Sequence, residues 1–108
     1  MISKLELQFE QLWVELYPDI DLEAEVRLIP NRKFRFDYVH YPSKTAIEIN
    51  GGNWNYGRHC RPQSLLSEYE KINLAQLLGF TVFILSGEMI NDIWLQKISD
   101  FIKLHSKK

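Results

Sequence analysis

The stretch RFDYVHYPSKTAIEIN, residues 35–50, predicts a β-hairpin at the centre of the fold. Residues 34–39 alternate apolar and polar side chains, as a half-buried strand does, which places Phe36 and Tyr38 on one face. A turn containing proline and serine follows, and residues 45–50 form the next strand. We therefore expect two antiparallel strands joined by a short turn.

This hairpin places two carboxylates opposite each other. If the strands are symmetric about the turn, Asp37 pairs directly with Glu48, with Cβ atoms about 5 Å apart. Like charges at that spacing are destabilising unless a cation lies between them, and Mg²⁺ prefers such oxygen ligands. Asn50, on the same face as Glu48, would add a further oxygen ligand. In the alternative interpretation Asp37 pairs with Arg35 or another base and Glu48 lies at a solvated edge. The metal interpretation is favoured because Glu48 lies between Ile47 and Ile49 with no basic residue beside it.

The flanking sequence predicts helices and further strands on either side of the hairpin. Ser3 and Glu6 have the spacing of a capping box at the start of a helix, and Gly79 closes a second helix. Three strands, at residues 25–29, 34–39 and 45–50, are expected to form an antiparallel meander. The order is a helix over residues 3–16, the three strands, a helix over 64–78, a buried strand over 80–85, covered on both faces, and a final helix with Ile90, Ile93, Trp94, Ile98, Phe101 and Ile102 on its apolar side. This is an α/β fold with a mixed four-stranded sheet flanked by helices.

Length and composition indicate one globular domain over residues 1–108. Hydrophobic residues make up 45% of the chain and charged residues 25%, which is typical of a soluble protein. Cys60 is the only cysteine, so we expect neither a disulfide nor a zinc site built from several cysteines. We expect no signal peptide, no membrane-spanning segment and a cytoplasmic location.

The net charge of −1 conceals an uneven distribution. Residues 1–25 carry seven acids and one lysine, a net charge of −6, so residues 26–108 carry twelve bases and seven acids, a net charge of +5. On charge alone, solvated surface residues are the favoured interpretation, and a phosphate-bearing partner is the alternative.

The segment after the hairpin lacks apolar periodicity and is expected to be a functional loop. His59 has the intrinsic pKa of a general base, and Arg58 and Arg61 beside it would contact phosphate. Trp54 and Tyr56 would stack on bases, or else pack over the edge of the sheet.

Several short motifs resemble the small phage and bacterial nucleases of the PD-(D/E)XK superfamily, and most of all the branch similar to very-short-patch-repair endonucleases. The motifs are RFD at 35–37, AIEINGG at 46–52 with Trp54, GRH at 57–59, EK at 70–71 with Asn73, and LGFTV at 78–82. The resemblance covers nearly the whole chain and implies a restriction-endonuclease-like core.

The resemblance also implies roles for individual residues. Asp37 and Glu48 match the acids that hold Mg²⁺ or Mn²⁺, and Glu6 matches an additional acid of the first helix, although it is equally explained by the capping box. The motif lysine expected two residues after Glu48 is Asn50 here, and Lys71 matches a lysine that some relatives carry on the second helix instead. A helix-surface lysine is the competing interpretation of Lys71.

Together these observations predict a metal-dependent endodeoxyribonuclease that hydrolyses phosphodiester bonds in DNA, by nicking or by recognising a DNA structure, in repair, recombination or mobile-element and phage biology. Lys33 and Arg35 would help to position the DNA backbone. One such site cuts one strand, so double-strand cleavage requires a homodimer or two encounters. The alternative is a DNA-binding module that keeps the nuclease fold and has lost catalysis through Asn50.

Overall fold

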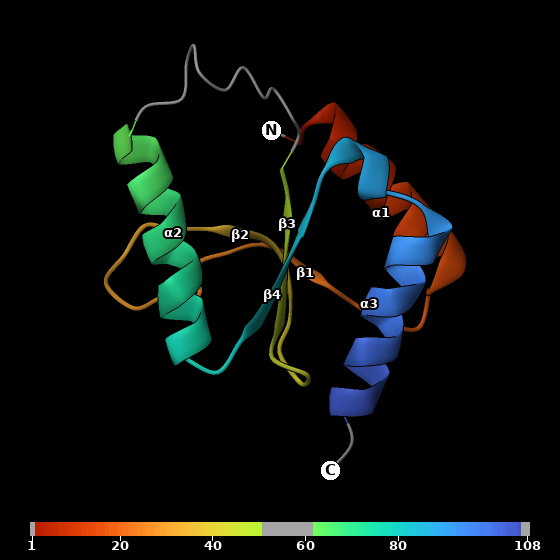
Figure 1. Ribbon diagram of the computed structural model, residues 1–108. Helices are drawn as coiled ribbons and strands as arrows, with labels where there is room; N and C mark the ends of the chain where they lie inside the picture. Colours follow the sequence, from red (N-terminus) through yellow and green to blue (C-terminus); the bar gives the residue numbers. More distant parts are fainter. Residues whose placement is uncertain (1, 51–61, 107–108) are drawn as a thin grey trace.

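The computed structural model describes residues 2–50 and 62–106, and the side chains of 62–64 are not considered. Figure 1 shows three helices arranged around a central sheet. In chain order the elements are α1 (Lys4–Leu16), β1 (Glu23–Val26), β2 (Phe36–His40), β3 (Thr45–Ile49), α2 (Pro62–Leu77), β4 (Thr81–Leu85), the 3-10 helix η1 (Gly87–Met89) and α3 (Asp92–His105). The predicted α/β class and element order are confirmed.

The strands form one mixed sheet in the order β1-β2-β3-β4. β1, β2 and β3 are antiparallel neighbours, and β4 lies parallel to β3 after the crossover through α2. In the hairpin His40 pairs with Thr45 and Tyr38 with Ile47, which is the predicted register. The hairpin therefore brings the residues before Tyr38 next to those after Ile47.

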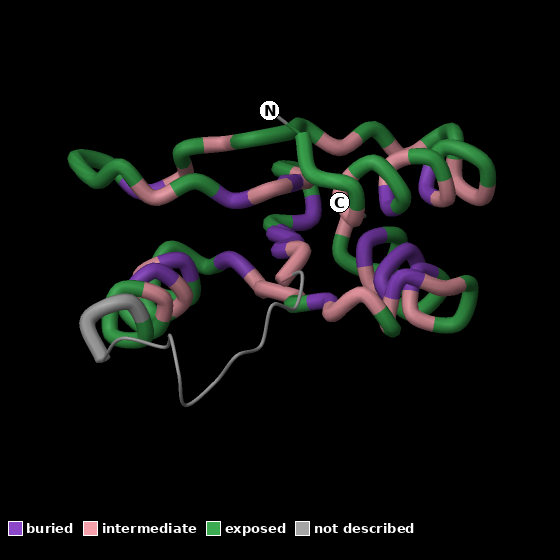
Figure 2. The backbone as a smooth tube through the Cα atoms, turned by 90° about the horizontal axis from the view of Figure 1, so that it is seen from above, coloured by how far each residue is buried: buried purple, intermediate pink, exposed green. Residues whose placement is uncertain are grey.

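Helices cover both faces of the sheet. α2 lies on one face, and α1 and α3 lie together on the other (Figure 1). Figure 2 shows buried positions along the strands and on the inner sides of the helices. One buried cluster joins α1 and α3 to the sheet and consists of Phe9, Trp13, Tyr38, Ile47, Leu85, Ile90, Leu95, Ile98 and Ile102. A second buried cluster joins α2 to the opposite face and consists of Ile29, Phe36, Val39, Ala46, Ala75 and Phe80.

Local sequence signals fix the ends of α1 and α2. The hydroxyl of Ser3 accepts a hydrogen bond from the backbone N–H of Glu6, and the Glu6 carboxylate accepts one from the backbone N–H of Ser3, which completes the predicted capping box. α2 ends in a Schellman motif, in which the N–H groups of Gly79 and Phe80 donate to the carbonyls of Gln76 and Ala75. Gly79 has φ of +92°, a conformation that favours glycine.

The first strand lies earlier in the chain than the sequence predicts. The expected span was 25–29, whereas β1 is Glu23–Val26 and Ile29 belongs to the buried cluster beneath α2. The chain turns at residues 29–32, where the N–H of Arg32 donates to the carbonyl of Ile29. Alternation of apolar residues continues past the point where the backbone leaves the sheet, so the pattern alone misplaced the strand. The bounds of the other strands and of α2 differ from expectation by one or two residues.

The predicted alternation of β2 is also wrong at one point. Phe36 packs with Val39 on the α2 side, whereas Tyr38 packs on the α1 and α3 side. β1 contributes to this break, because Glu25 has φ of 54° and lies between the pairs Ala24–Tyr38 and Val26–Phe36. The regular pleat therefore ends where Asp37 begins.

Two predictions about the C-terminal part need correction. Ile93, which was expected on the apolar side of the last helix, is 67% exposed. Leu95 is buried in the core instead. α3 begins only at Asp92, with Asn91 as its N-cap, so the buried Ile90 lies outside the helix, and the buried face within it is set by Leu95, Ile98 and Ile102. β4 is not fully covered on both faces as expected, because Ile84 is 41% exposed and Leu85 is its one buried residue.

Among the described residues, no helix has the length and apolar character needed to cross a membrane.

Candidate active site

The carboxylates of Asp37 and Glu48 lie side by side where β2 and β3 separate. The backbone N–H of Asp37 donates to Glu48 Oε1 at 3.4 Å, and the backbone N–H of Ile49 donates to Asp37 Oδ2 at 2.7 Å. Each carboxylate thus accepts a hydrogen bond from the backbone of the opposite strand. The pair predicted from the hairpin register is present, and both side chains are fixed by main-chain contacts.

Lys71 reaches this pair from α2. Its Nζ forms a salt bridge with Glu48 Oε2 and lies 4.7 Å from the centroid of the Phe36 ring. Both partners are buried, with 9% of Lys71 and 7% of Glu48 exposed. The ammonium of Lys71 is therefore enclosed between an acid and an aromatic ring, and it is not a solvated helix-surface lysine.

The expectation that Glu48 has no basic neighbour is wrong, because the neighbour comes from an element distant in the sequence. A signal for it exists in α2. Lys71 precedes the fully buried Ala75 by four residues, and this spacing puts both side chains on the helix face that packs against the sheet. Helical spacing applied to the charged residues of α2 would have indicated the contact.

Burial dominates the ionisation of Glu48. Loss of water raises the pKa of Glu48 to about 7, the contact with Lys71 opposes this rise, and the nearby charge of Asp37 adds to it. The carboxylate is held ready to ionise near neutral pH. A cation entering the site would favour its charged form.

Glu6 lies close to the acid pair as well as at the start of α1. It is the capping-box residue of α1, and its carboxylate also faces Asp37. Burial raises the pKa of Glu6, the hydrogen bond from Ser3 lowers it, and the charge of Asp37 raises it further. Glu6 is thus a third acid at the same end of the sheet.

A cavity of about 410 Å³ adjoins Asp37 and contains basic as well as acidic groups. Its lining residues are Glu6, Glu25, Lys33, Phe34, Arg35 and Asp37. Arg35 bonds to Glu25 at 3.4 Å, so the alternative in which Arg35 neutralises Asp37 is not what the structure contains. Lys33 and Arg35 line this cavity together with Asp37.

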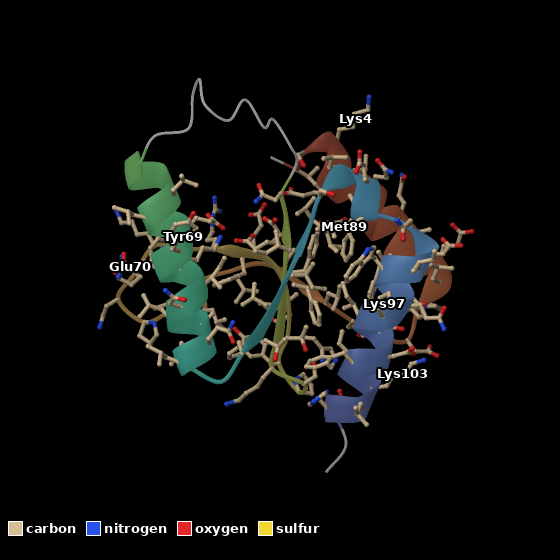
Figure 3. All side chains as sticks on the ribbon, viewed as in Figure 1. Lys4, Tyr69, Glu70, Met89, Lys97 and Lys103 are labelled. Atoms are coloured by element: carbon tan, nitrogen blue, oxygen red, sulfur yellow. The ribbon has the colours of Figure 1, made fainter. Side chains whose placement is uncertain are left out.

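A bidentate ion pair connects the chain segment beside this cavity to α2. Arg32 Nη1 and Nη2 lie 3.0 and 3.1 Å from the two carboxylate oxygens of Glu70, the residue preceding Lys71. Figure 3 shows Glu70 on the outer side of α2, toward the connection between β1 and β2. The pair links the segment carrying Lys33 to the helix carrying Lys71.

The other predicted site residues are only partly placed. Asn50 directly follows β3, and its backbone N–H donates to the carbonyl of Leu85 at 2.8 Å. The expected contributions of the loop, namely those of Trp54, Tyr56, Arg58, His59 and Arg61, lie outside the described residues, as does Cys60.

The donor chemistry of the acid pair fits a hard divalent cation. Within residues 2–50 and 62–106, no group of three or more His, Cys, Asp or Glu side chains is arranged to enclose a metal ion. Mg²⁺ commonly takes only one or two carboxylates and completes its coordination with water and phosphate. Asp37 and Glu48 supply oxygen ligands of this kind, so the residues present fit such an ion.

Comparison with known proteins identifies a structural neighbour. No family model matches the chain. No curated protein matches it either. The fold is similar to the solved structure of the catalytic domain of the homing endonuclease I-Bth0305I, with a TM-score of 0.70 and 18% sequence identity, over 98% of this chain and 100% of that one. At this identity the similarity establishes a shared α/β fold.

Proposed function

We propose that this chain is a metal-dependent endodeoxyribonuclease domain of the PD-(D/E)XK type, in the branch similar to very-short-patch-repair endonucleases. The observation that carries the proposal is the acid pair of Asp37 and the buried Glu48, with the ammonium of Lys71 in contact with Glu48. The solved structure that this fold resembles is the catalytic domain of a homing endonuclease, and this similarity supports an endonuclease function.

Asp37 and Glu48 would hold Mg²⁺ or Mn²⁺, with Asn50 as a further oxygen ligand. Bound there, the ion would neutralise charge on the scissile phosphate and lower the pKa of water. The main-chain hydrogen bonds to both carboxylates orient them without further ordering. Glu6 adds negative charge beside Asp37.

Lys71 would perform the task of the motif lysine that Asn50 replaces. Its ammonium donates hydrogen bonds and carries a positive charge, so it would orient the attacking water or stabilise the charge that develops on the phosphorus oxygens. The salt bridge with Glu48 holds the ammonium at the acid pair. His59 remains the alternative proton acceptor.

DNA is the proposed substrate, and two basic residues, Lys33 and Arg35, line the cavity beside Asp37. Lys33 and Arg35 would contact backbone phosphates beside the cavity. From the loop, Arg58 and Arg61 would add phosphate contacts, and Trp54 and Tyr56 would stack on bases. Such contacts predict a strong loss of affinity as salt concentration rises.

The test is metal-dependent cleavage of labelled DNA. The wild-type chain is expected to nick at least one of duplex, mismatched, branched or single-stranded DNA in Mg²⁺ or Mn²⁺ and to be inactive in EDTA. Glu48→Ala should abolish nicking with the fold retained, as judged by circular dichroism. The matched control is Asp100→Ala, which removes an exposed acid in the C-terminal half of α3 and should leave cleavage unchanged. Unchanged cleavage by Glu48→Ala would refute the assignment.

A second candidate is a catalytically impaired DNA-binding module. Asn50 in place of the motif lysine favours it, as does the engagement of Lys71 by Glu48. Binding of DNA at low salt without cleavage in either metal ion, over a range of pH, would support this alternative against the nuclease.

The proposal extends to the whole chain as one nuclease-like domain acting in the cytoplasm, in repair, recombination or mobile-element and phage biology. A homodimer would allow cleavage of both strands. Sedimentation of the chain with and without DNA tests that expectation.

A further inference from the structure

A second cavity lies between α1 and β1, and it does not include the acid pair. Its volume is about 280 Å³, just below the roughly 300 Å³ at which sites for drug-sized ligands begin. Four aromatic rings contribute to its lining, those of Phe9, Trp13, Tyr17 and Tyr38. A cavity of this size suits a small ligand with an apolar body.

The charged groups that line this cavity are acidic. Glu10 and Asp21 are among its lining residues, and no lysine, arginine or histidine is. The cavity also lies within the N-terminal segment, residues 1–25, whose net charge is −6. Its charge therefore complements a cation and opposes an anion.

The neutral polar groups on the wall are largely engaged within the protein. Trp13 Nε1–H donates to the carbonyl of Ile20 at 2.9 Å, and the hydroxyl of Tyr38 donates to Glu10 Oε2 at 2.7 Å. Carboxylate oxygens accept more than one hydrogen bond, so Glu10 retains accepting capacity beyond its contact with Tyr38. Phe9, Trp13 and Tyr38 are buried in the core, so the cavity offers a ligand carboxylate acceptors and aromatic surface chiefly from Tyr17.

Aromatic rings next to carboxylates attract organic cations through the negative faces of the rings and through direct charge. The protein already makes one cation–π contact with a lining residue of this cavity, because Lys103 Nζ of α3 lies 5.7 Å from the centroid of the Tyr17 ring. Lys103 and Lys97 project from α3, as Figure 3 shows.

We propose that this cavity is a binding site for a small organic cation, an ammonium group carried on an apolar body. The ring of Tyr17 and the apolar side chains of Val14 and Pro18 would contact the apolar body, and Glu10 and Asp21 would receive the ammonium group. The site is independent of the proposed nuclease function, because neither Asp37 nor Glu48 lines it.

Three probes of similar shape and different charge test the proposal by nuclear magnetic resonance: 2-phenylethylammonium, 2-phenylethanol and 3-phenylpropanoate. They are titrated into the ¹⁵N-labelled full chain in phosphate buffer at low salt. The indole N–H of Trp13 is the principal reporter. We expect saturable shifts there, with the ammonium bound at least about fivefold more tightly than the alcohol and the propanoate bound most weakly. Equal affinity for the three probes would overturn the proposal, because the cavity would then be merely apolar.

Variants locate the charge that the cation recognises. Glu10→Gln keeps an acceptor for the hydroxyl of Tyr38, and Asp21→Asn changes an exposed side chain, so both are expected to fold, as their spectra will verify. Each should weaken ammonium binding about two- to fivefold and leave binding of the alcohol unchanged. Asp19→Asn is the control, since Asp19 belongs to the same acidic segment and does not line the cavity. An equal loss in the control would attribute the attraction to diffuse surface charge and would contradict the site.

A last probe distinguishes a free cation from a lysine side chain of another polypeptide. Lysine capped at both ends carries the same ammonium on a peptide unit. It is expected to bind more weakly than 2-phenylethylammonium, because its stem lacks the aromatic body that the ring of Tyr17 would contact. Tighter binding of the capped lysine would overturn the assignment to a free small ligand.

Discussion

Replacement of Glu48 by glutamine measures the cost of the buried negative charge in the candidate active site. Burial raises the pKa of Glu48 to about 7, although the contact with Lys71 opposes the rise, while the pKa in the unfolded chain is the ordinary 4.5. Glutamine has nearly the shape of protonated Glu48 and does not ionise. The pH dependence of the difference in stability between the two proteins therefore reports the titration of Glu48 together with its coupling to Lys71 and Asp37.

The direction follows from proton binding. Between pH 4.5 and about 7 the folded protein keeps a proton that the unfolded chain has released, so rising pH favours unfolding. Below that interval both states are protonated and the effect is absent, and above it the loss is complete. Since one pKa unit corresponds to about 1.4 kcal/mol, the whole interval amounts to roughly 3 kcal/mol.

Urea unfolding followed by tryptophan fluorescence provides the assay, at about pH 5 and about pH 8 in EDTA. Titrating groups away from Glu48 contribute equally to both proteins and cancel in the difference, whereas Lys71 and Asp37, which interact with Glu48, belong to the measured effect. The free energy of unfolding of the wild type, relative to Glu48→Gln, should fall by roughly 2–3 kcal/mol between the two pH values. A difference that stays constant or grows with pH would show that Lys71 stabilises the anion more than burial penalises it, and would refute the reasoning.

Three further predictions concern Lys71, the end of α2 and the core face of α3. Lys71→Met should lower single-turnover DNA cleavage at least about 100-fold and change DNA affinity by less than about threefold, measured by rapid quench and fluorescence anisotropy; equal losses in both would contradict a catalytic role. Gly79→Ala should lower the free energy of unfolding by about 1 kcal/mol or more, because alanine is strained at φ of +92°, whereas Gly87→Ala, which lacks a positive φ, should change it by less than about 0.5 kcal/mol in the same urea assay. Leu95→Ala should cost about 2–5 kcal/mol in thermal or urea unfolding and Ile93→Ala less than about 0.5 kcal/mol, because Leu95 is fully buried and Ile93 is 67% exposed; similar losses would contradict the assigned helix phase.

Much of the acid pair was predictable because its geometry is local. Asp37 and Glu48 are joined by one short turn, and the pairing of His40 with Thr45 fixes which residues meet further along the strands. The interruption of the pleat at Asp37 was not predictable from the same pattern. It depends on the conformation of Glu25 in the neighbouring strand and on hydrogen bonds between side chains and main chain, which periodicity does not encode.

The sequence by itself determined the capping box of α1, the glycine end of α2, the hairpin register and the order of elements. These features depend on residues a few positions apart, and their energies act within one turn or one strand pair. Only the tertiary structure decided that Lys71 meets Glu48, that Arg35 bonds to Glu25, and that burial outweighs the lysine in setting the ionisation of Glu48. Such contacts depend on how α2 and β1 pack against the hairpin, and the exclusion of water that gives them their strength arises only when the layers come together.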